Sequence, residues 1–143
     1  MNYAVIKSFD IANGPGVRVS LFVSGCRHKC KNCFNSEAWD FGYGHPFTED
    51  TLKEITDSLN KSYIEGFSLL GGEPFEPENQ PEVCKILTHI KENFPEKTVW
   101  CYTGCELDNQ LLAGQVGQQK TVLEILSHTD DFVDGKFVEE LKS

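Results

Sequence analysis

The chain has 143 residues, the size of one ordinary domain, and a domain near this length buries about 70% of the surface that its unfolded chain exposes. It carries 22 acidic against 13 basic side chains, a formal charge of −9, and this balance argues against nucleic-acid binding, which needs a basic face. An acidic surface of this kind is usually a solvated one, although it is also compatible with a basic protein partner.

The N-terminal ten residues contain no apolar stretch of signal-peptide length after a basic start, and no later run approaches membrane-spanning length. The sequence therefore predicts a cytoplasmic protein without membrane association. Six cysteines in such a chain are expected to be ligands, redox groups or free thiols rather than disulfides. Three of them are isolated in the sequence, and we expect Cys84, Cys101 and Cys105 to be buried or incidental thiols.

The first elements of the chain are a predicted turn and a predicted strand. Residues 13–16 have the sequence Asn-Gly-Pro-Gly, a cluster of turn-forming residues. In 17–23, valine and leucine alternate with Arg18, Ser20 and Phe22, which predicts a strand buried mostly on one side. A group of cysteines begins where this strand ends. In α/β folds, functional sites lie on loops that follow the carboxyl ends of parallel strands. The position of the cysteines directly after this strand agrees with that rule.

The cysteine group consists of Cys26, Cys30 and Cys33, with the spacing C-x3-C-x2-C. A loop this short can turn three thiolates toward one point, and thiolates select zinc, copper(I) or iron–sulfur clusters. A disulfide within the stretch would leave an odd thiol and close a tight, strained ring. Three cysteines on a four-iron cluster would leave one iron open for chemistry. The alternative is a structural zinc site with His28 as fourth ligand, although His28 lies between the first two cysteines, where its reach is awkward.

A second candidate loop follows the next predicted strand. Residues 41–46 are expected to be irregular surface, and Thr48 is a good N-cap for a helix over 49–60. A strand within 63–70 then runs into Gly71-Gly72-Glu73-Pro74. Glycines let the backbone come close to a ligand and proline fixes the turn, so the loop could bind the ammonium group of an amino-acid-like cofactor. Taken alone, it could equally be a plain strand-to-helix turn.

The rest of the chain alternates helices and strands. A helix is predicted from Pro81 to Phe94, then a strand over 98–103, helical segments over 107–113 and 118–127, and a short strand within 131–138 broken at 134–135. This alternation indicates an α/β fold built from parallel β–α units. A closed eight-unit barrel needs about 250 residues, so this chain can form only a partial barrel.

The cysteine spacing together with the Gly-Gly-Glu-Pro sequence resembles the radical S-adenosylmethionine (SAM) enzymes. Further segments resemble one family among them, the activating proteins of anaerobic ribonucleoside-triphosphate reductases. They are spread over nearly the whole chain: residues 13–16, 21–26, 33–35, Trp39, 102–104 and 133–137. The resemblance implies a single radical SAM domain over 1–143, folded as a partial, open (β/α) barrel with mainly parallel strands. It also implies that the turn at 13–16 lies close to the cluster end of the molecule.

The resemblance further implies the site residues. The catalytic centre would be a [4Fe–4S] cluster whose metal ligands are Cys26, Cys30 and Cys33, with the amine and carboxylate of SAM on the open iron. The loop that contacts the methionyl amine would comprise Gly71, Gly72, Glu73 and Pro74. Many radical SAM enzymes have an aromatic residue just before the third cysteine, where this chain has Asn32. Phe34 follows that cysteine instead, so which of the two contacts the adenine stays open.

The implied reaction is the activation of a partner enzyme. One electron from an external flavodoxin- or ferredoxin-type donor would pass through the cluster and cleave SAM. The 5′-deoxyadenosyl radical would then take the α-hydrogen of a glycine in the large subunit of the reductase. The cofactors carry this chemistry, while the protein positions them and excludes quenchers. We assign no catalytic role to the four scattered histidines, His28, His45, His89 and His128.

Two alternatives stay open at this point. One is a radical SAM enzyme with another target, either a formate-lyase-type glycyl-radical enzyme or a small molecule. The short chain favours a protein substrate, because a partial barrel leaves room for a peptide loop to enter. The other is a zinc-stabilised interaction module without enzymatic activity. The family usually continues past residues 133–137 with a C-terminal tail, so the sequence leaves open whether this chain is a short member or is cut before the tail.

Overall fold

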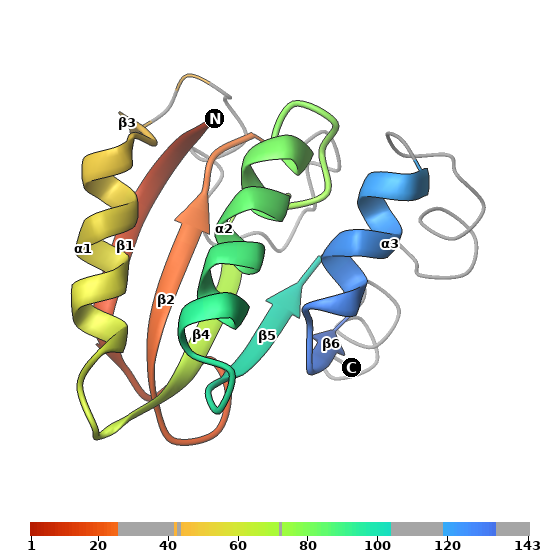
Figure 1. The fold of residues 1–143 in the computed structure, drawn as a ribbon. Helices are drawn as coiled ribbons and strands as arrows, with labels where there is room; N and C mark the ends of the chain where they lie inside the picture. The colour runs from red at the N-terminus through yellow and green to blue at the C-terminus, as the bar shows by residue number, and fades with distance from the viewer. Residues whose placement is uncertain (26–41, 43, 72, 104–118, 134–143) are drawn as a thin grey trace, which may run out of the picture.

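The computed structural model describes residues 1–25, 42, 44–71, 73–103 and 119–133 (Figure 1). Its strands are β1 (Asn2–Asp10), β2 (Val17–Val23), β3 (His45–Pro46), β4 (Ile64–Gly71), β5 (Thr98–Tyr102) and β6 (Asp131–Val133), and its helices are α1 (Glu49–Leu59), α2 (Gln80–Asn93) and α3 (Gln119–Ser127). The strands form one mixed sheet in the order β3-β1-β2-β4-β5-β6. The neighbours from β2 to β6 are parallel, whereas β1 is antiparallel to both β2 and β3.

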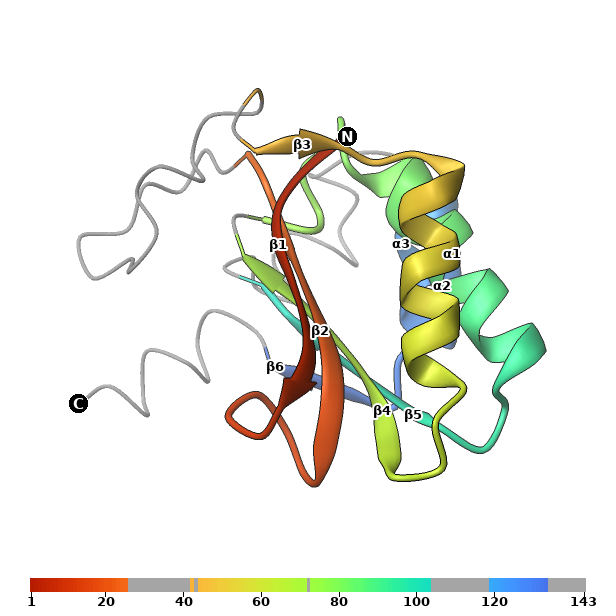
Figure 2. The same ribbon diagram turned by 90° about the vertical axis from the view of Figure 1, so that its left-hand side faces the viewer.

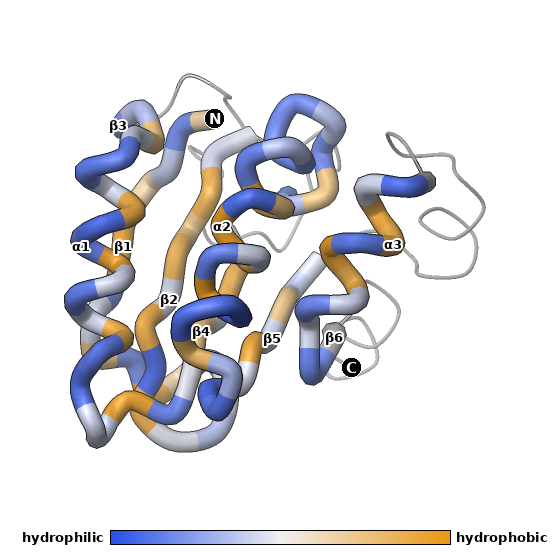
Figure 3. The backbone as a smooth tube through the Cα atoms, in the orientation of Figure 1, coloured by the Kyte–Doolittle hydropathy of each residue, from blue (hydrophilic) through white to orange (hydrophobic). Residues whose placement is uncertain are grey.

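The three helices cover one face of this sheet, as the edge-on view in Figure 2 shows. Hydrophobic residues run along β2 and β4 beneath them (Figure 3). The core between the two layers is built from Val19, Leu21 and Val23 of β2, Phe67 and Leu69 of β4, Leu52, Ile55 and Leu59 of α1, Val83, Ile86, Leu87 and Ile90 of α2, and Val122 and Ile125 of α3. Burying one such leucine or isoleucine side chain stabilises the fold by about 1.5–3 kcal/mol.

The predicted helices within the described residues are confirmed, and local chemistry explains their ends. Thr48 and Thr51 form a reciprocal capping box at the start of α1, which satisfies backbone N–H groups that have no partner inside the helix. Pro81 lies in the first turn of α2, where a missing N–H costs nothing, and the helix ends before Pro95. The helix predicted over 107–113 and the part of the last strand beyond residue 133 lie outside the described residues.

The first 46 residues differ from the prediction in three ways. Residues 2–10 were not expected to form a strand, yet β1 pairs antiparallel with β2, with Tyr3 opposite Val23 and Asp10 opposite Arg18. This register places the turn at 13–16 beside the start of β2, so the expectation that it lies near the cluster end is wrong. A short strand, β3, also lies in the segment that was expected to be irregular, because His45 and Pro46 pair with the start of β1.

Strand β2 is buried on both faces, whereas the alternation predicted burial mostly on one. Arg18 and Ser20, which alternate with the core valines, are both 0% exposed. Their polar groups are bonded: Arg18 Nε donates to Ser68 Oγ at 2.8 Å, and Ser20 Oγ donates to Asp10 Oδ2 at 2.6 Å. A polar residue can therefore lie inside a central strand without the cost of an unpaired buried group. None of the helices in the described part of the chain is long and apolar enough to cross a membrane.

Candidate functional site

The candidate site lies where β2, β4 and β5 end, which we call the carboxyl end of the sheet. Gly25 is the last described residue before Cys26, and Glu73 is in the loop 71–74, which we call the GGEP loop. The N–H of Glu73 donates to the carbonyl of Gly25 at 2.8 Å. This bond continues the parallel ladder in which Val23 lies opposite Gly71. Gly25, which stands just before the first cysteine in the sequence, and Glu73 of the GGEP loop are therefore neighbours, because they follow adjacent parallel strands.

Gly71 is a position where only glycine suits the backbone. Its φ is +114°, a conformation that side chains rarely adopt, and a Cβ built there would lie 2.5 Å from the backbone nitrogen of Val23. The sequence predicted that this glycine permits close approach to a ligand. In the structure the close approach is to the neighbouring strand, and it allows the GGEP loop to leave the sheet tightly against β2.

The Glu73 side chain points into the protein and is 0% exposed. Its Oε2 accepts a hydrogen bond from the backbone N–H of Phe75 at 2.9 Å and another from the hydroxyl of Thr103. Thr103 follows β5, so the carboxylate links the GGEP loop to the next strand of the sheet. A buried carboxylate is tolerated when donors of this kind surround it.

Asn79 makes the corresponding link toward β2. Its side chain is 1% exposed, and Nδ2 donates at 3.0 Å both to the carbonyl of Ser24 and to the carbonyl of Glu73. Asn79 holds the N-cap position of α2, yet its side chain makes no capping hydrogen bond. The neighbouring Gln80 donates to the carbonyl of Phe75 at 2.7 Å, a bond within the same connection.

The residues predicted to hold metal lie outside the described residues, as do Asn32, Phe34 and Gly72. Within the described part, no group of three or more His, Cys, Asp or Glu side chains could hold a metal ion. Gly25, which contacts Glu73 of the GGEP loop, directly precedes the part of the sequence that carries Cys26, Cys30 and Cys33. Three thiol side chains are soft sulfur donors of the kind that bind an iron–sulfur cluster, so the chemistry of these residues agrees with the implied group.

Comparison with known proteins gives the family. Residues 12–143 match the family model of a 4Fe-4S single cluster domain. Proteins named anaerobic ribonucleoside-triphosphate reductase-activating protein are similar over nearly the whole chain: that of Enterobacteria phage T4 is 41% identical over 141 residues, covering 99% of this chain and 84% of the relative. The protein of Escherichia coli K12 is 40% identical, covering 99% and 88%, and that of Vibrio cholerae is 37% identical, covering 98% and 86%. The chain belongs to the family of anaerobic ribonucleoside-triphosphate reductase-activating proteins.

The resemblance predicted from the sequence is thereby confirmed at the level of the family and of the 4Fe–4S domain. The matched range includes every predicted site residue. The individual roles of the three cysteines, of Asn32 and Phe34 and of the GGEP loop stay predictions. Among the described members of that loop, Glu73 and Pro74 are buried and Gly71 is half-buried.

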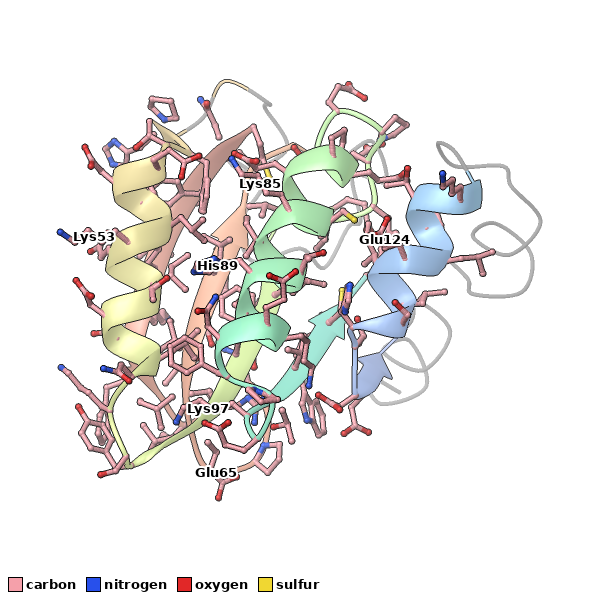
Figure 4. All side chains as sticks on the ribbon, viewed as in Figure 1. Lys53, Glu65, Lys85, His89, Lys97 and Glu124 are labelled. Carbon is pink, nitrogen blue, oxygen red and sulfur yellow. The ribbon has the colours of Figure 1, made fainter. Side chains whose placement is uncertain are left out.

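A hollow of about 520 Å³ lies elsewhere, lined by residues of α1, α2 and α3. Of its lining residues, Lys85, His89 and Glu124 are labelled in Figure 4. Lys85 and Glu124 are at its wall, and Lys85 forms an ion pair with Glu49 at 2.6 Å. Cys84 also lines it, and burial, together with the neighbouring Glu124 carboxylate, raises the pKa of that thiol. Cys101 is buried in the core. Both cysteines therefore fit the predicted buried or incidental thiols, while Cys105 lies outside the described residues.

Three residues that join the loops, Ser24, Asn79 and Thr103, were not predicted from the sequence. Thr103 belongs to a segment that carried the resemblance, and an asparagine just before Gln-Pro is a typical helix start, so both places had a local signal. That signal predicts caps and strand ends. It does not predict a hydrogen bond between residues 55 apart, as between Asn79 and Ser24, because such a bond depends on the register of the sheet.

Proposed function

We propose that this protein is the activating enzyme of an anaerobic ribonucleoside-triphosphate reductase. When bound, the [4Fe–4S] cluster and SAM would supply the reductive cleavage that yields a 5′-deoxyadenosyl radical, which generates a glycyl radical on the large subunit of the reductase. The observation that carries the proposal is the Glu73 N–H···Gly25 carbonyl bond, which joins the GGEP loop to the start of the cysteine segment in a chain of this family.

The chain's own residues have separate parts in this proposal. Cys26, Cys30 and Cys33 hold the cluster, and their loop includes Asn32 and Phe34 as candidates for contact with the adenine. The GGEP loop receives the methionyl end of SAM. Its anchoring to β2 and β5 supports this role, because a cofactor that reacts at one atom must be held in a fixed orientation.

We also propose the partial, open barrel of the radical SAM type for the fold, as one domain over 1–143. The parallel run from β2 to β6 and the helices on one face support it (Figure 2). The opposite face of the sheet would then be the concave side, from which a glycine-bearing loop of the reductase approaches. The electron donor would be of the flavodoxin or ferredoxin type, and the reaction would take place in the cytoplasm.

The experiment that tests the proposal uses protein purified and reconstituted without oxygen. We expect a [4Fe–4S]+ signal in the electron paramagnetic resonance (EPR) spectrum of the reduced protein, and we expect SAM to change it. Cys30→Ala should abolish bound iron and SAM cleavage, because two thiolates remain where three are needed. Cys84→Ala, which removes a thiol on α2, is the matched control and should retain both.

Two results would contradict the proposal. One is SAM cleavage at the normal rate by the Cys30→Ala protein, and the other is zinc without iron in the native chain, which would indicate a zinc-stabilised module. The choice of target is tested by incubating the reduced enzyme and SAM with the anaerobic reductase. A glycyl radical signal on the reductase is expected; a signal only on a formate-lyase-type enzyme would favour the other activase.

A further inference from the structure

We infer that Asn79 is a positioning residue that fixes the start of the cysteine segment relative to the GGEP loop, with the Glu73–Thr103 bond as its counterpart on the β5 side. The inference rests on the proposed function, because it concerns how the two parts of that site are held together. It assigns Asn79 no contact with cluster or cofactor.

The side-chain amide of Asn79 connects two segments of the chain. One NH2 group donates to two backbone carbonyls, each at 3.0 Å, that belong to different segments. Ser24 stands two residues before Cys26, and Glu73 lies inside the GGEP loop. The two hydrogens of a planar amide have fixed directions, so the group sets the spacing of the two carbonyls.

The Asn79 side chain does not cap its own helix. An asparagine at an N-cap normally accepts a hydrogen bond from the first turn of its helix, and such a cap contributes about 1 kcal/mol. Here the backbone of Asn79 is helical, with φ −95° and ψ −25°, and no cap bond forms. Gln80 N–H instead donates to the Glu76 carbonyl at 3.0 Å. The side chain therefore donates to the carbonyls of Ser24 and Glu73 and makes no hydrogen bond to the first turn of its own helix.

A second buried hydrogen bond anchors the GGEP loop on the β5 side. The Glu73 carboxylate accepts from Thr103, which is 5% exposed at the end of β5. The GGEP loop is thus tied to both neighbouring segments by buried side chains, through Asn79 and through Glu73. A displacement of about 1 Å at a reacting centre can cost about a hundredfold in rate, so we expect the loss of either tie to weaken the site.

The test compares two adjacent buried amides. Asn79→Ala removes the hydrogen bonds to the Ser24 and Glu73 carbonyls, whereas Gln80→Ala removes a hydrogen bond to the Phe75 carbonyl and leaves both bonds of Asn79 in place. Gln80 is 2% exposed, so both variants lose a buried amide and both should unfold at a lower midpoint. SAM affinity is measured by titrating the change in the EPR signal of the reduced cluster. We expect the Kd for SAM to rise about tenfold or more in Asn79→Ala and less than about twofold in Gln80→Ala, a difference of about 1 kcal/mol or more.

A second pair of variants tests the β5 side and covers the case in which Asn79→Ala does not fold. Thr103→Val keeps the shape and removes the hydroxyl, whereas Thr103→Ser keeps the hydroxyl. We expect weaker SAM binding in the valine variant and recovery in the serine variant. Recovery through the hydroxyl alone is a result that lost packing would not give, because serine is the smaller of the two side chains.

The outcomes separate this inference from the proposed function. If the native chain binds no cluster, or its signal does not respond to SAM, the proposed function fails and the inference with it. If the native chain responds but Asn79→Ala and Gln80→Ala bind SAM equally at equal iron content, only the inference is overturned. Equal affinities in Thr103→Val and Thr103→Ser would likewise overturn it for the β5 side.

Discussion

The two ends of the sheet are each held by a buried charged side chain, but for different purposes. At the amino end, where β2, β4 and β5 begin, Arg18 joins all three strands to the turn at 13–16. At the carboxyl end, Glu73 joins the GGEP loop to β5, and Asn79 joins it to β2. Glu65 and Lys97, labelled in Figure 4, lie at the amino end, and Lys85 lies toward the other.

At the amino end the guanidinium is fully used by the protein. Its five N–H groups donate to five acceptors: Ser68 Oγ, the Pro15 carbonyl, Thr98 Oγ1, the Phe67 carbonyl and the Thr98 carbonyl. Burial lowers the pKa of Arg18. The central carbon of its guanidinium lies 5.9 Å from the centroid of the Trp100 ring. The predicted cysteines begin at the opposite end of β2. Both ends contain a buried, hydrogen-bonded polar side chain, so this feature does not distinguish them. The cysteines that follow the carboxyl end of β2 identify that end as the functional one.

The largest change in stability is expected from Arg18→Met. It removes the shared donor of the Pro15, Phe67 and Thr98 carbonyls and of the Ser68 and Thr98 hydroxyls, and we expect the free energy of unfolding to fall by about 4 kcal/mol. Urea unfolding measures this change. SAM affinity of the folded variant should equal that of the native chain, since Arg18 is at the amino end. A variant that stays stable but loses affinity more than about tenfold would place Arg18 in the site.

A smaller effect on stability, now at the carboxyl end, is expected from Gly71→Ala. The φ of +114° is strained for alanine, and its Cβ would meet the Val23 backbone at 2.5 and 2.6 Å. We expect a loss of about 2–3 kcal/mol in unfolding free energy, together with weaker SAM binding. Gly14→Ala, at the amino end with φ +119°, is the matched control and should lose stability only. Equal SAM affinities in the two variants would show that Gly71 influences the site no more than Gly14 does.

Glu73 tests whether the carboxyl end needs a charge or only an acceptor. Glu73→Gln keeps an oxygen that can accept from Phe75 and Thr103, so we expect a stability loss of at most about 1 kcal/mol and little change in SAM affinity. Glu73→Ala removes both bonds and should lose about 2 kcal/mol, with weakened SAM binding. Thermal unfolding and the EPR titration measure the two quantities. A large loss of affinity in Glu73→Gln alone would indicate that the charge itself contacts the cofactor.

Most of the strands and helices could be predicted from the sequence, whereas the side-chain hydrogen bonds between the loops could not. The core valines of β2 and the apolar stripe of α2 follow periods of two and 3.6 residues, so their strand and helix could be predicted locally. β1 could not, because its residues are half exposed and its pairing is set by β2. Cys26, Cys30 and Cys33 were found by spacing and Gly71 by its loop. Asn79 was missed because its role depends on bringing residues 24, 73 and 79 together, which no local period encodes.

The smallest effect is expected from Asp10, which belongs to the amino end. Asp10 is 5% exposed and accepts hydrogen bonds from Ser20, Asn13 and the N–H of Ala12. Burial raises the pKa of this carboxyl, but these hydrogen bonds outweigh it, so the pKa lies below its usual range. A carboxyl with a lowered pKa in the folded state stabilises the protein at pH values above its unfolded pKa, which is about 3.9. That stabilisation is lost as the pH falls through the folded value.

Asp10→Asn should therefore cost about 1 kcal/mol at pH 7, and the difference from the native chain should shrink below about pH 4. Urea unfolding at pH 7, 5 and 3 measures it, with Asp57→Asn on the exposed side of α1 as the control for loss of one negative charge. SAM affinity near neutral pH should be unchanged, because the bonds of Asp10 hold the turn that follows β1. Stability curves of the native and Asp10→Asn chains that stay parallel down to pH 3 would show that the ionised Asp10 carboxylate does not stabilise the turn that follows β1.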